Sequence, residues 1–172
     1  MDFKNISLIG FMGSGKSTIG KILAKKMGLL FIDLDRVIEL DQEKEIRDIF
    51  RIYGEKYFRE SETSVIKKIY RNKNCVFACG GGVVKRKENM DIIRKNSLVV
   101  YLNVSIPDII FRLKEAKDRP LVDVENKEET IEKMMMDRDV LYRKYAHIII
   151  DNDDDDFDRT ADMILEETKK IK

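Results

Sequence analysis

A glycine-rich octapeptide near the start of the chain, GFMGSGKS at Gly10–Ser17, fits the pattern G-x-x-x-x-G-K-[ST]. Glycines at this spacing let successive backbone N–H groups point inward at phosphate oxygens, and a following helix N-terminus adds a partial positive charge. In this chemistry Lys16 reaches the β- and γ-phosphates of a nucleotide, and the Ser17 hydroxyl ligates Mg²⁺. The sequence therefore predicts a nucleoside triphosphate site.

Nucleotide binding leaves several classes of P-loop protein open. The N-K-x-D sequence with which switch GTPases read guanine is missing, because the nearest strings, at 72–75 and 126–129, both lack the Asp. A large motor ATPase does not fit in 172 residues. Small kinases are therefore the leading class, and an ATP-dependent switch or binding module without turnover is the alternative.

Two acids spaced i, i+2, Asp33 and Asp35, follow the apolar run that begins at Leu30. In extended backbone they point the same way, and at the carboxyl end of a strand they face the crevice in which open α/β sheets bind ligands. One carboxylate can then hold Mg²⁺ through water, while the other accepts a proton from an acceptor hydroxyl or orients it. The alternative is that Asp35 is the N-cap of a following helix.

Three further features are weaker when each is taken alone. Arg59 and Glu62 share a face of a predicted helix, where a surface ion pair is the default interpretation, as it is for the side chain of Arg138. The triplet Gly80–Gly82 directly follows a predicted strand, and indicates either backbone that approaches a ligand closely or a flexible turn.

The charged stretch Lys114–Glu129 breaks the hydrophobic periodicity. It is either a solvated surface loop or a mobile lid, and long loops in compact domains are often functional. Arg119 precedes Pro120 within it, and from a lid this arginine can reach the transferring phosphoryl group.

The elements that must position these residues are predicted from hydrophobic periodicity. Nearly continuous apolar runs predict strands covered on both faces, as in a parallel sheet, and longer amphipathic stretches between them predict helices. This alternation is typical of a three-layer α/β domain with right-handed crossovers. The expected strands are Ile6–Ile9, Leu30–Ile32, Val76–Cys79, Leu98–Leu102 and His147–Ile150. The expected helices begin after the octapeptide and at Ile46, and cover about 55–70, 86–95, 106–116, 128–144 and 158–170.

Composition narrows the class further. A chain of 172 residues with 43% apolar residues predicts one domain, 1–172, with a substantial core. Because 33 Lys and Arg balance 32 Asp and Glu, a nucleic-acid or membrane-surface partner is not expected. The longest apolar run, Leu98–Leu102, is far too short to span a bilayer, and no signal segment precedes Gly10. Cys75 and Cys79 exclude a disulfide framework, so a reduced cytoplasmic protein is expected.

Taken together in their order and spacing, these motifs resemble the shikimate kinase family from the phosphate loop to about Asp151. The resemblance implies a five-stranded parallel sheet of the nucleoside-monophosphate-kinase type. It also implies transfer of the γ-phosphoryl group of ATP to the 3-hydroxyl of shikimate, in aromatic amino-acid biosynthesis. The motifs that carry it are GSGKST at 13–18, the Asp33-x-Asp35 pair, Phe58-Arg59-x-x-Glu62, the glycine triplet, Arg119-Pro120-Leu121 and Arg138-x-x-x-Tyr142.

The resemblance assigns a role to each matching position. Asp35 binds the shikimate hydroxyls and serves as the base, Asp33 and Ser17 hold the magnesium, and Arg59 and Arg138 clamp the carboxylate. Backbone at Gly80, Gly81 and Gly82 meets the hydroxyls, and Glu62 orients Arg59. A lid at about 112–127 carries Arg119 to the phosphates beside Lys16, and Arg112 stacks near the adenine. The residues expected to bind the ATP phosphates are Gly13, Ser14, Gly15, Lys16, Ser17 and Thr18.

Some features stay outside this assignment. The acidic stretch at 151–156 is expected to be a solvated linker that makes no adenine contact, with a cation site as the alternative. His147 and both cysteines are expected to be structural. Another small-molecule kinase, for gluconate or a nucleoside monophosphate, is the nearest rival, but such an enzyme does not need both arginines. A monomer is expected, with a weak dimer as the alternative.

Overall fold

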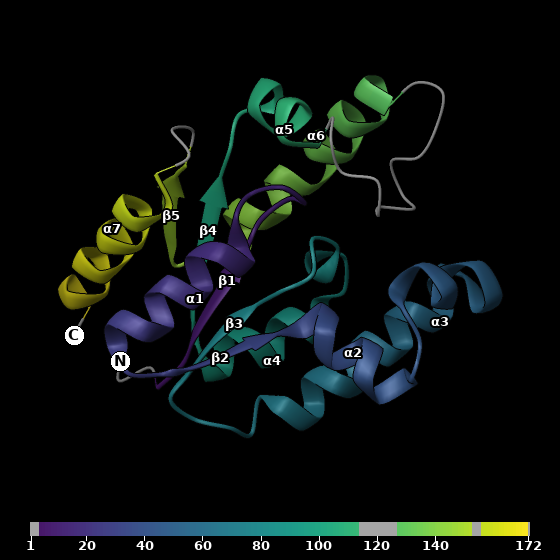
Figure 1. Cartoon of the computed structure of the whole chain (residues 1–172), viewed down its shortest axis with the longest axis horizontal. Coiled ribbons are helices and arrows are strands. Elements are labelled where there is room, and N and C mark those ends of the chain that lie inside the picture. Colours follow the sequence, from purple (N-terminus) through teal and green to yellow (C-terminus); the bar gives the residue numbers. More distant parts are fainter. Residues whose placement is uncertain (1–3, 114–126, 153–155, 172) are drawn as a thin grey trace.

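Five short runs rich in β-branched residues pair into one parallel sheet in the order β2-β3-β1-β4-β5 (Figure 1). The computed structural model describes residues 4–113, 127–152 and 156–171. The strands are β1 Ile6–Ile9, β2 Leu30–Asp33, β3 Cys75–Ala78, β4 Leu98–Asn103 and β5 Ile148–Asp151. The helices are α1 Lys16–Met27, α2 Leu34–Gln42, α3 Ile46–Ile69, α4 Lys87–Asn96, α5 Ile106–Leu113, α6 Lys127–Tyr145 and α7 Phe157–Lys170, with a 3₁₀ turn, η1, at Val83–Lys85. The predicted five-stranded α/β fold is confirmed.

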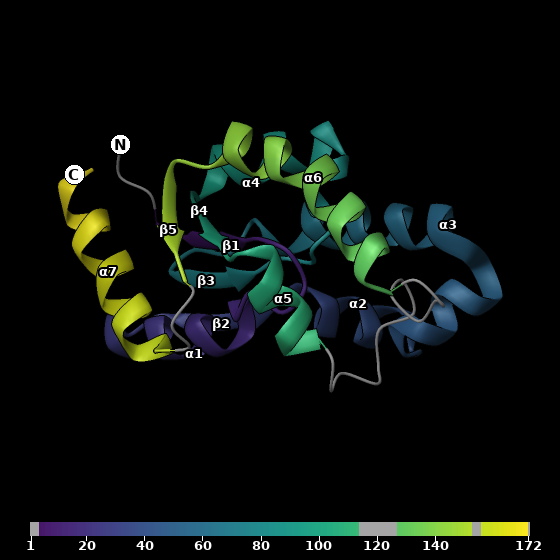
Figure 2. The same ribbon diagram turned by 90° about the horizontal axis from the view of Figure 1, so that it is seen from above.

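Helices cover both faces of this sheet and divide the apolar core in two. Figure 2 shows α1 and α7 on one side of the sheet and α4 and α6 on the other. Alternate strand residues point to opposite faces. Leu8 therefore joins the cluster with Leu23 of α1 and Ile164 of α7, whereas Ile9 joins the cluster on the opposite face. Both faces of the sheet therefore pack against helices through apolar side chains.

The two edge strands depart from the prediction of strands buried on both faces. Leu30 of β2 is 69% exposed and Ile149 of β5 is 43% exposed, whereas every residue of β1 and β3 is buried. β2 and β5 are the outer strands of the sheet, and side chains of both remain partly in water. The prediction is therefore wrong for β2 and β5.

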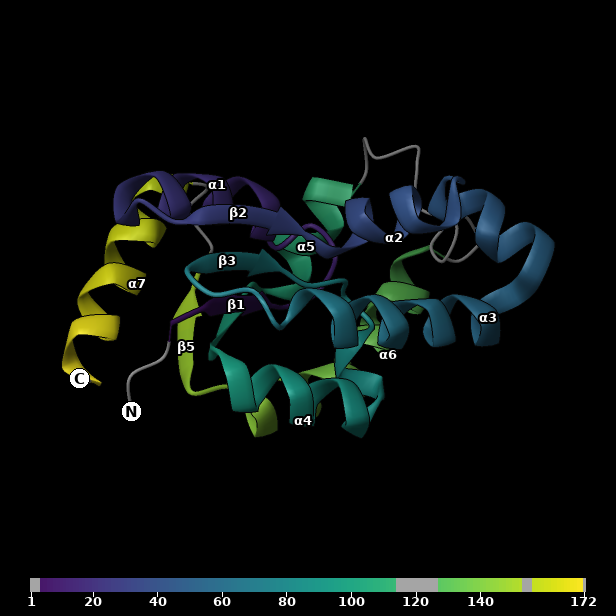
Figure 3. The same cartoon turned by 90° about the horizontal axis from the view of Figure 1, so that it is seen from below.

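A glycine divides the long helix α3 where the sequence predicts one helix to end and another to begin. Gly54 has φ 80° and ψ 174°, a backbone conformation that residues with a Cβ rarely adopt. The residues before it form an arm with α2, and this arm projects beyond the carboxyl end of β2 (Figure 3). The second half of α3 returns toward the sheet and carries Arg59 and Glu62.

Within the described residues, no helix is long and apolar enough to cross a membrane.

Candidate active site

The octapeptide runs from the end of β1 into the first turn of α1, as the sequence predicts. Gly13 and Gly15 have φ of 80° and 83°, so the tight loop needs glycine at both positions. The ammonium of Lys16 donates to the carbonyls of Gly10, at 3.0 Å, and Phe11, at 2.6 Å. The loop therefore curls around the lysine that is predicted to meet the phosphates.

Asp33 links the phosphate loop to the start of α2. One carboxylate oxygen accepts a hydrogen bond from Ser17 Oγ at 2.6 Å, and the other accepts from the backbone N–H groups of Asp35, at 3.1 Å, and Arg36, at 3.4 Å. Asp33 is thus the N-cap of α2, and Asp35 lies in its first turn. The predicted extended pair is wrong, and so is the alternative in which Asp35 is the cap.

A first pocket, of about 340 Å³, opens over the phosphate loop at the carboxyl ends of β1 and β3. This edge of the sheet is where open α/β folds bind ligands. Phe157, which sequence reasoning missed, stands in its wall with Arg112. The other residues that line it are Gly13, Gly15, Lys16, Ser17, Thr18, Asp33, Asp35, Ala78, Cys79 and Gly81.

A second pocket, of about 480 Å³, lies between the α2–α3 arm and the glycine triplet. It combines apolar side chains with three arginines, of which Arg59 and Arg138 are predicted site residues and Arg47 is not. Its lining residues are Met12, Asp35, Glu39, Glu45, Ile46, Arg47, Phe50, Phe58, Arg59, Glu62, Gly80, Gly81, Gly82 and Arg138. The apolar part was not predicted, since nothing local distinguishes Phe50 or Met12 from core residues.

The two pockets share two lining residues, Asp35 and Gly81. A group that passes from a ligand over the phosphate loop to a ligand beside the arginines therefore crosses at the carboxylate of Asp35.

The glycine triplet is required by close approach rather than by flexibility. A Cβ on Gly80 would lie 2.7 Å from Asp35 Oδ1, and one on Gly82 would overlap the guanidinium of Arg59. Side chains at these positions would push both site residues out of place. Because β3 is hydrogen-bonded to β1, the triplet also lies beside the phosphate loop, as predicted.

Arg59 and Glu62 form a buried ion pair, so the surface interpretation is wrong for them. Arg59 is 6% exposed and Glu62 is fully buried, with Arg59 Nη1 3.1 Å from both carboxylate oxygens. On its other side Arg59 Nε donates to Glu55 at 3.3 Å. Burial raises the pKa of Glu62 to about 7, against the opposing attraction of the guanidinium. The predicted contact between Glu62 and Arg59 is present.

Arg138 is also buried, which corrects its default interpretation as a surface arginine. Its guanidinium lies 5.4 Å from the centroid of the Phe11 ring and donates to the carbonyl of Gly81 at 3.4 Å. Tyr142 donates to the same carbonyl from one turn further along α6. The loop after β3 is therefore fixed by α6, and Arg138 faces the second pocket beside Arg59.

Arg112 lies at the end of α5, where it donates to the carbonyls of Gly13, at 3.3 Å, and Asn152, at 2.9 Å. Asn152 is fully buried, and its amide donates to the carbonyl of Ser14 at 3.0 Å. The expected solvated linker at 151–156 is therefore wrong for Asn152, because this residue is buried and supports the phosphate loop. Arg119 lies outside the described residues, as does most of the predicted lid, and so do residues 153–155 of the acidic stretch.

His147 and Cys75 line neither pocket of the site, and Cys79 contributes to the wall of the first pocket. His147 Nδ1 accepts from the backbone N–H of Val99 at 2.9 Å, and burial lowers the pKa of this histidine. Cys75 and Cys79 are free and buried. No group of three or more His, Cys, Asp or Glu that could hold a metal occurs in the part of the chain that the structure describes.

Two pockets that meet at one carboxylate, one over a phosphate loop and one lined by arginines, suit transfer of a phosphoryl group between two small molecules. The fold and this arrangement define a P-loop kinase of the nucleoside-monophosphate-kinase type.

Comparison with known proteins gives the family. A family model described as shikimate kinase matches residues 12–169. A shikimate kinase of Thermodesulfovibrio yellowstonii is 44% identical over 98% of this chain and 96% of its own length, and one of Marinomonas sp. is 40% identical over 96% and 92%. A structure of shikimate kinase from Acinetobacter baumannii in complex with shikimate superposes with a TM-score of 0.96 at 35% identity, covering 99% of this chain and 95% of that one. The chain belongs to the shikimate kinase family, and it is an ATP-dependent kinase.

Proposed function

We propose that this enzyme transfers the γ-phosphoryl group of ATP to the 3-hydroxyl of shikimate, giving 3-phosphoshikimate and ADP for aromatic amino-acid biosynthesis. The observation that carries the proposal is that the nucleotide pocket and the arginine-lined pocket meet at Asp35. The hydroxyl oxygen forms a bond to the γ-phosphorus, the bond to the β–γ bridging oxygen breaks, and the hydroxyl proton passes to Asp35. We expect one domain, a monomer and a cytoplasmic location, as the sequence predicts.

The second pocket suits a cyclic acid. Arg59 and Arg138 both line it, and planar guanidinium forks pair bidentately with a carboxylate. Phe50 and Phe58 give the same pocket an apolar wall against which a carbocycle can pack. A nucleoside monophosphate or the open chain of gluconate fits this combination of two arginines and an apolar wall less well.

The first pocket is proposed to hold ATP. Backbone from Gly13 to Thr18 and the ammonium of Lys16 would receive the phosphates, and Arg112 with the Phe157 ring would flank the adenine. Arg119 keeps its proposed role at the transferring phosphoryl group. Lys16 and the arginine supply the positive charge that the transition state requires.

The oxygen atoms of Ser17 and Asp33 fit Mg²⁺. They are hard ligands, 2.6 Å apart, at the edge of the phosphate pocket. Two protein oxygens are enough, because Mg²⁺ in such sites takes its other ligands from phosphates and water. When bound, the ion neutralises the charge on the β- and γ-phosphates. Ser17 would bind it directly and Asp33 through water.

Asp33→Asn tests the metal assignment. Asparagine is as good an N-cap as aspartate, so α2 keeps its cap while the charge near the metal is lost. We expect the Mg²⁺ concentration for half-maximal activity to rise by about tenfold or more, since a lost interaction with a charged group is worth 1.5–3 kcal/mol. Titration of activity with Mg²⁺ at saturating ATP and shikimate measures it. An unchanged Mg²⁺ dependence would remove Asp33 from the metal site.

The acceptor is tested by ADP release in a coupled assay with Mg-ATP, using shikimate, gluconate and the common nucleoside monophosphates separately. We expect turnover with shikimate alone. Turnover with another acceptor would keep the nucleotide site and discard the acceptor assignment. Bound ATP without turnover for any acceptor would favour the switch-module alternative.

A further inference from the structure

A fully buried amide lies behind the acceptor pocket. Asn89, on the first turn of α4, is completely inaccessible to solvent and does not line either pocket of the site. Its Nδ2 lies 3.3 Å from Glu62 Oε2, on a helix separate from the one that carries Glu62. Asn89 and Arg59 therefore contact the same carboxylate, that of Glu62.

The rest of the Asn89 amide is not satisfied. Among the described residues, Asn89 Oδ1 is the buried side-chain atom with no hydrogen-bond partner. A flipped amide would set this oxygen against the carboxylate of Glu62, so the ion pair fixes the orientation of the amide. Burial of an unpaired carbonyl costs stability that an apolar side chain of the same branching, such as leucine, would not. A polar residue is thus kept here at a cost, and the bond to Glu62 is what it provides.

We propose that Asn89 is a positioning residue for the acceptor carboxylate: its Nδ2 holds Glu62, and Glu62 holds the guanidinium of Arg59 in the second pocket. This inference rests on the proposed function. The three groups form a chain from α4 through the inner face of α3 to the pocket wall. If the amide is lost, Glu62 loses the hydrogen bond that Asn89 donates to its carboxylate, so the carboxylate fixes the guanidinium less firmly, although Glu55 still contacts it.

The ionisation of Glu62 allows the proposed role of Asn89 to be tested through the pH dependence of the shikimate KM. Burial brings the pKa of Glu62 to about 7, so its protonation changes within the working range. The hydrogen bond from Asn89 favours the ionised form, and its removal raises the pKa further. The other charged or titratable groups that face Glu62 are Arg59 on α3, Asp35 on α2, Arg86 before α4 and Cys79 at the end of β3; Arg138 of α6 lines the same pocket.

Two substitutions that keep the branching of the side chain have opposite expected effects on the pH dependence of the shikimate KM. Asn89→Leu removes the donor and so raises the pKa of Glu62. Near pH 7 Glu62 is then protonated and no longer holds Arg59 as an ion pair, so the shikimate KM rises by about tenfold; at pH 9, where Glu62 is ionised, the KM rises less. In Asn89→Asp the new carboxyl group and that of Glu62 share one proton at lower pH, which keeps a hydrogen bond between them. At higher pH both groups are ionised and repel each other. The shikimate KM of this variant therefore rises with pH. The KM for ATP stays unchanged in both.

Steady-state kinetics from pH 6 to 9 with shikimate and ATP varied separately is the experiment. Asn96→Leu is the matched control: its amide binds the carbonyl of Ile92 at the far end of α4, and we expect wild-type kinetics. The inference would be overturned by an unchanged shikimate KM in folded Asn89→Leu. It would also be overturned if the shikimate KM changed with pH in the same direction in both variants. If Asn89→Leu does not fold, Asn89→Asp is a sufficient test: a shikimate KM with the pH dependence of the wild type would overturn the inference. No shikimate turnover by the wild type contradicts the proposed function instead, and the inference with it.

Discussion

Asp35→Asn is expected to lower kcat for shikimate phosphorylation by about 10² or more, which is the usual size of a lost general base. Asp35 is the carboxylate that both pockets share, and its Oδ1 lies where a Cβ on Gly80 would be only 2.7 Å away. Asparagine keeps the size and the polar contacts of the side chain but cannot accept the hydroxyl proton. The affinity for ATP should change little, because Lys16 and the loop backbone are intact.

The control for this variant is Asp41→Asn on the same helix. Asp41 pairs with Lys68 at 2.8 Å and lines neither pocket of the site, so wild-type kcat is expected. Initial rates of ADP release give kcat, and isothermal titration gives ATP affinity. If kcat of Asp35→Asn stays near the wild-type value, Asp35 is not the base.

Arg138→Met is expected to raise the shikimate KM by about 10²-fold without changing the KM for ATP. Removal of one partner from a buried charged hydrogen-bonded pair costs about 2–5 kcal/mol, and tenfold in affinity is about 1.4 kcal/mol. Methionine keeps much of the aliphatic part of the arginine side chain but loses the guanidinium, which lies 5.4 Å from the centroid of the Phe11 ring. Arg59→Met should act in the same way but also destabilise the fold, because it leaves Glu62 buried without its cation.

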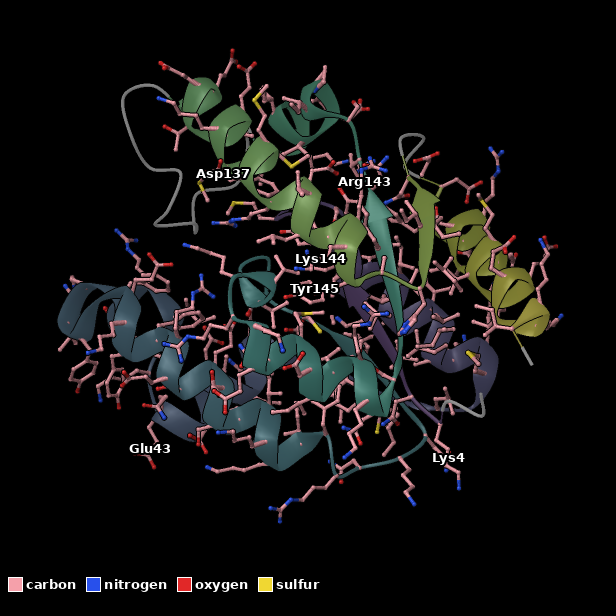
Figure 4. The ribbon with its side chains drawn as sticks, turned by 180° about the vertical axis from the view of Figure 1, so that it is seen from behind. Lys4, Glu43, Asp137, Arg143, Lys144 and Tyr145 are labelled. Atoms are coloured by element: carbon pink, nitrogen blue, oxygen red, sulfur yellow. The ribbon has the colours of Figure 1, made fainter. Side chains whose placement is uncertain are left out.

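Arg143→Met is the matched control, since it lies on the same helix near the carboxyl end of β4 (Figure 4) and pairs with Asp139 at 2.7 Å. An amide analogue of shikimate separates charge recognition from fit. It should bind weakly to the wild type and to Arg138→Met alike. A wild-type shikimate KM in both arginine variants would reject the carboxylate clamp.

The sequence by itself determined the features whose information is local. The phosphate loop is contiguous, so its glycines, Lys16 and Ser17 can be read from spacing alone. The five strands and the separation of the helix that begins at Ile46 from the one at about 55–70 follow from apolar periodicity. The first strand has its predicted ends, and the other four differ from theirs by one residue. The family followed from several weak motifs because their order and spacing are jointly specific.

The tertiary structure alone decided how the acceptor side is built. Whether Arg59 and Arg138 are surface cations or buried ones depends on α3, α6 and the loop after β3, which are far apart in the sequence. The start of α2 at Leu34 decided that Asp33 caps the helix and that Asp35 faces both pockets from its first turn. Asn89 and Asn152 carried no local signal, because a buried amide is defined by its distant partners, Glu62 and Ser14. Burial, and with it the raised pKa of Glu62, is a property of the packed molecule and not of any segment of it.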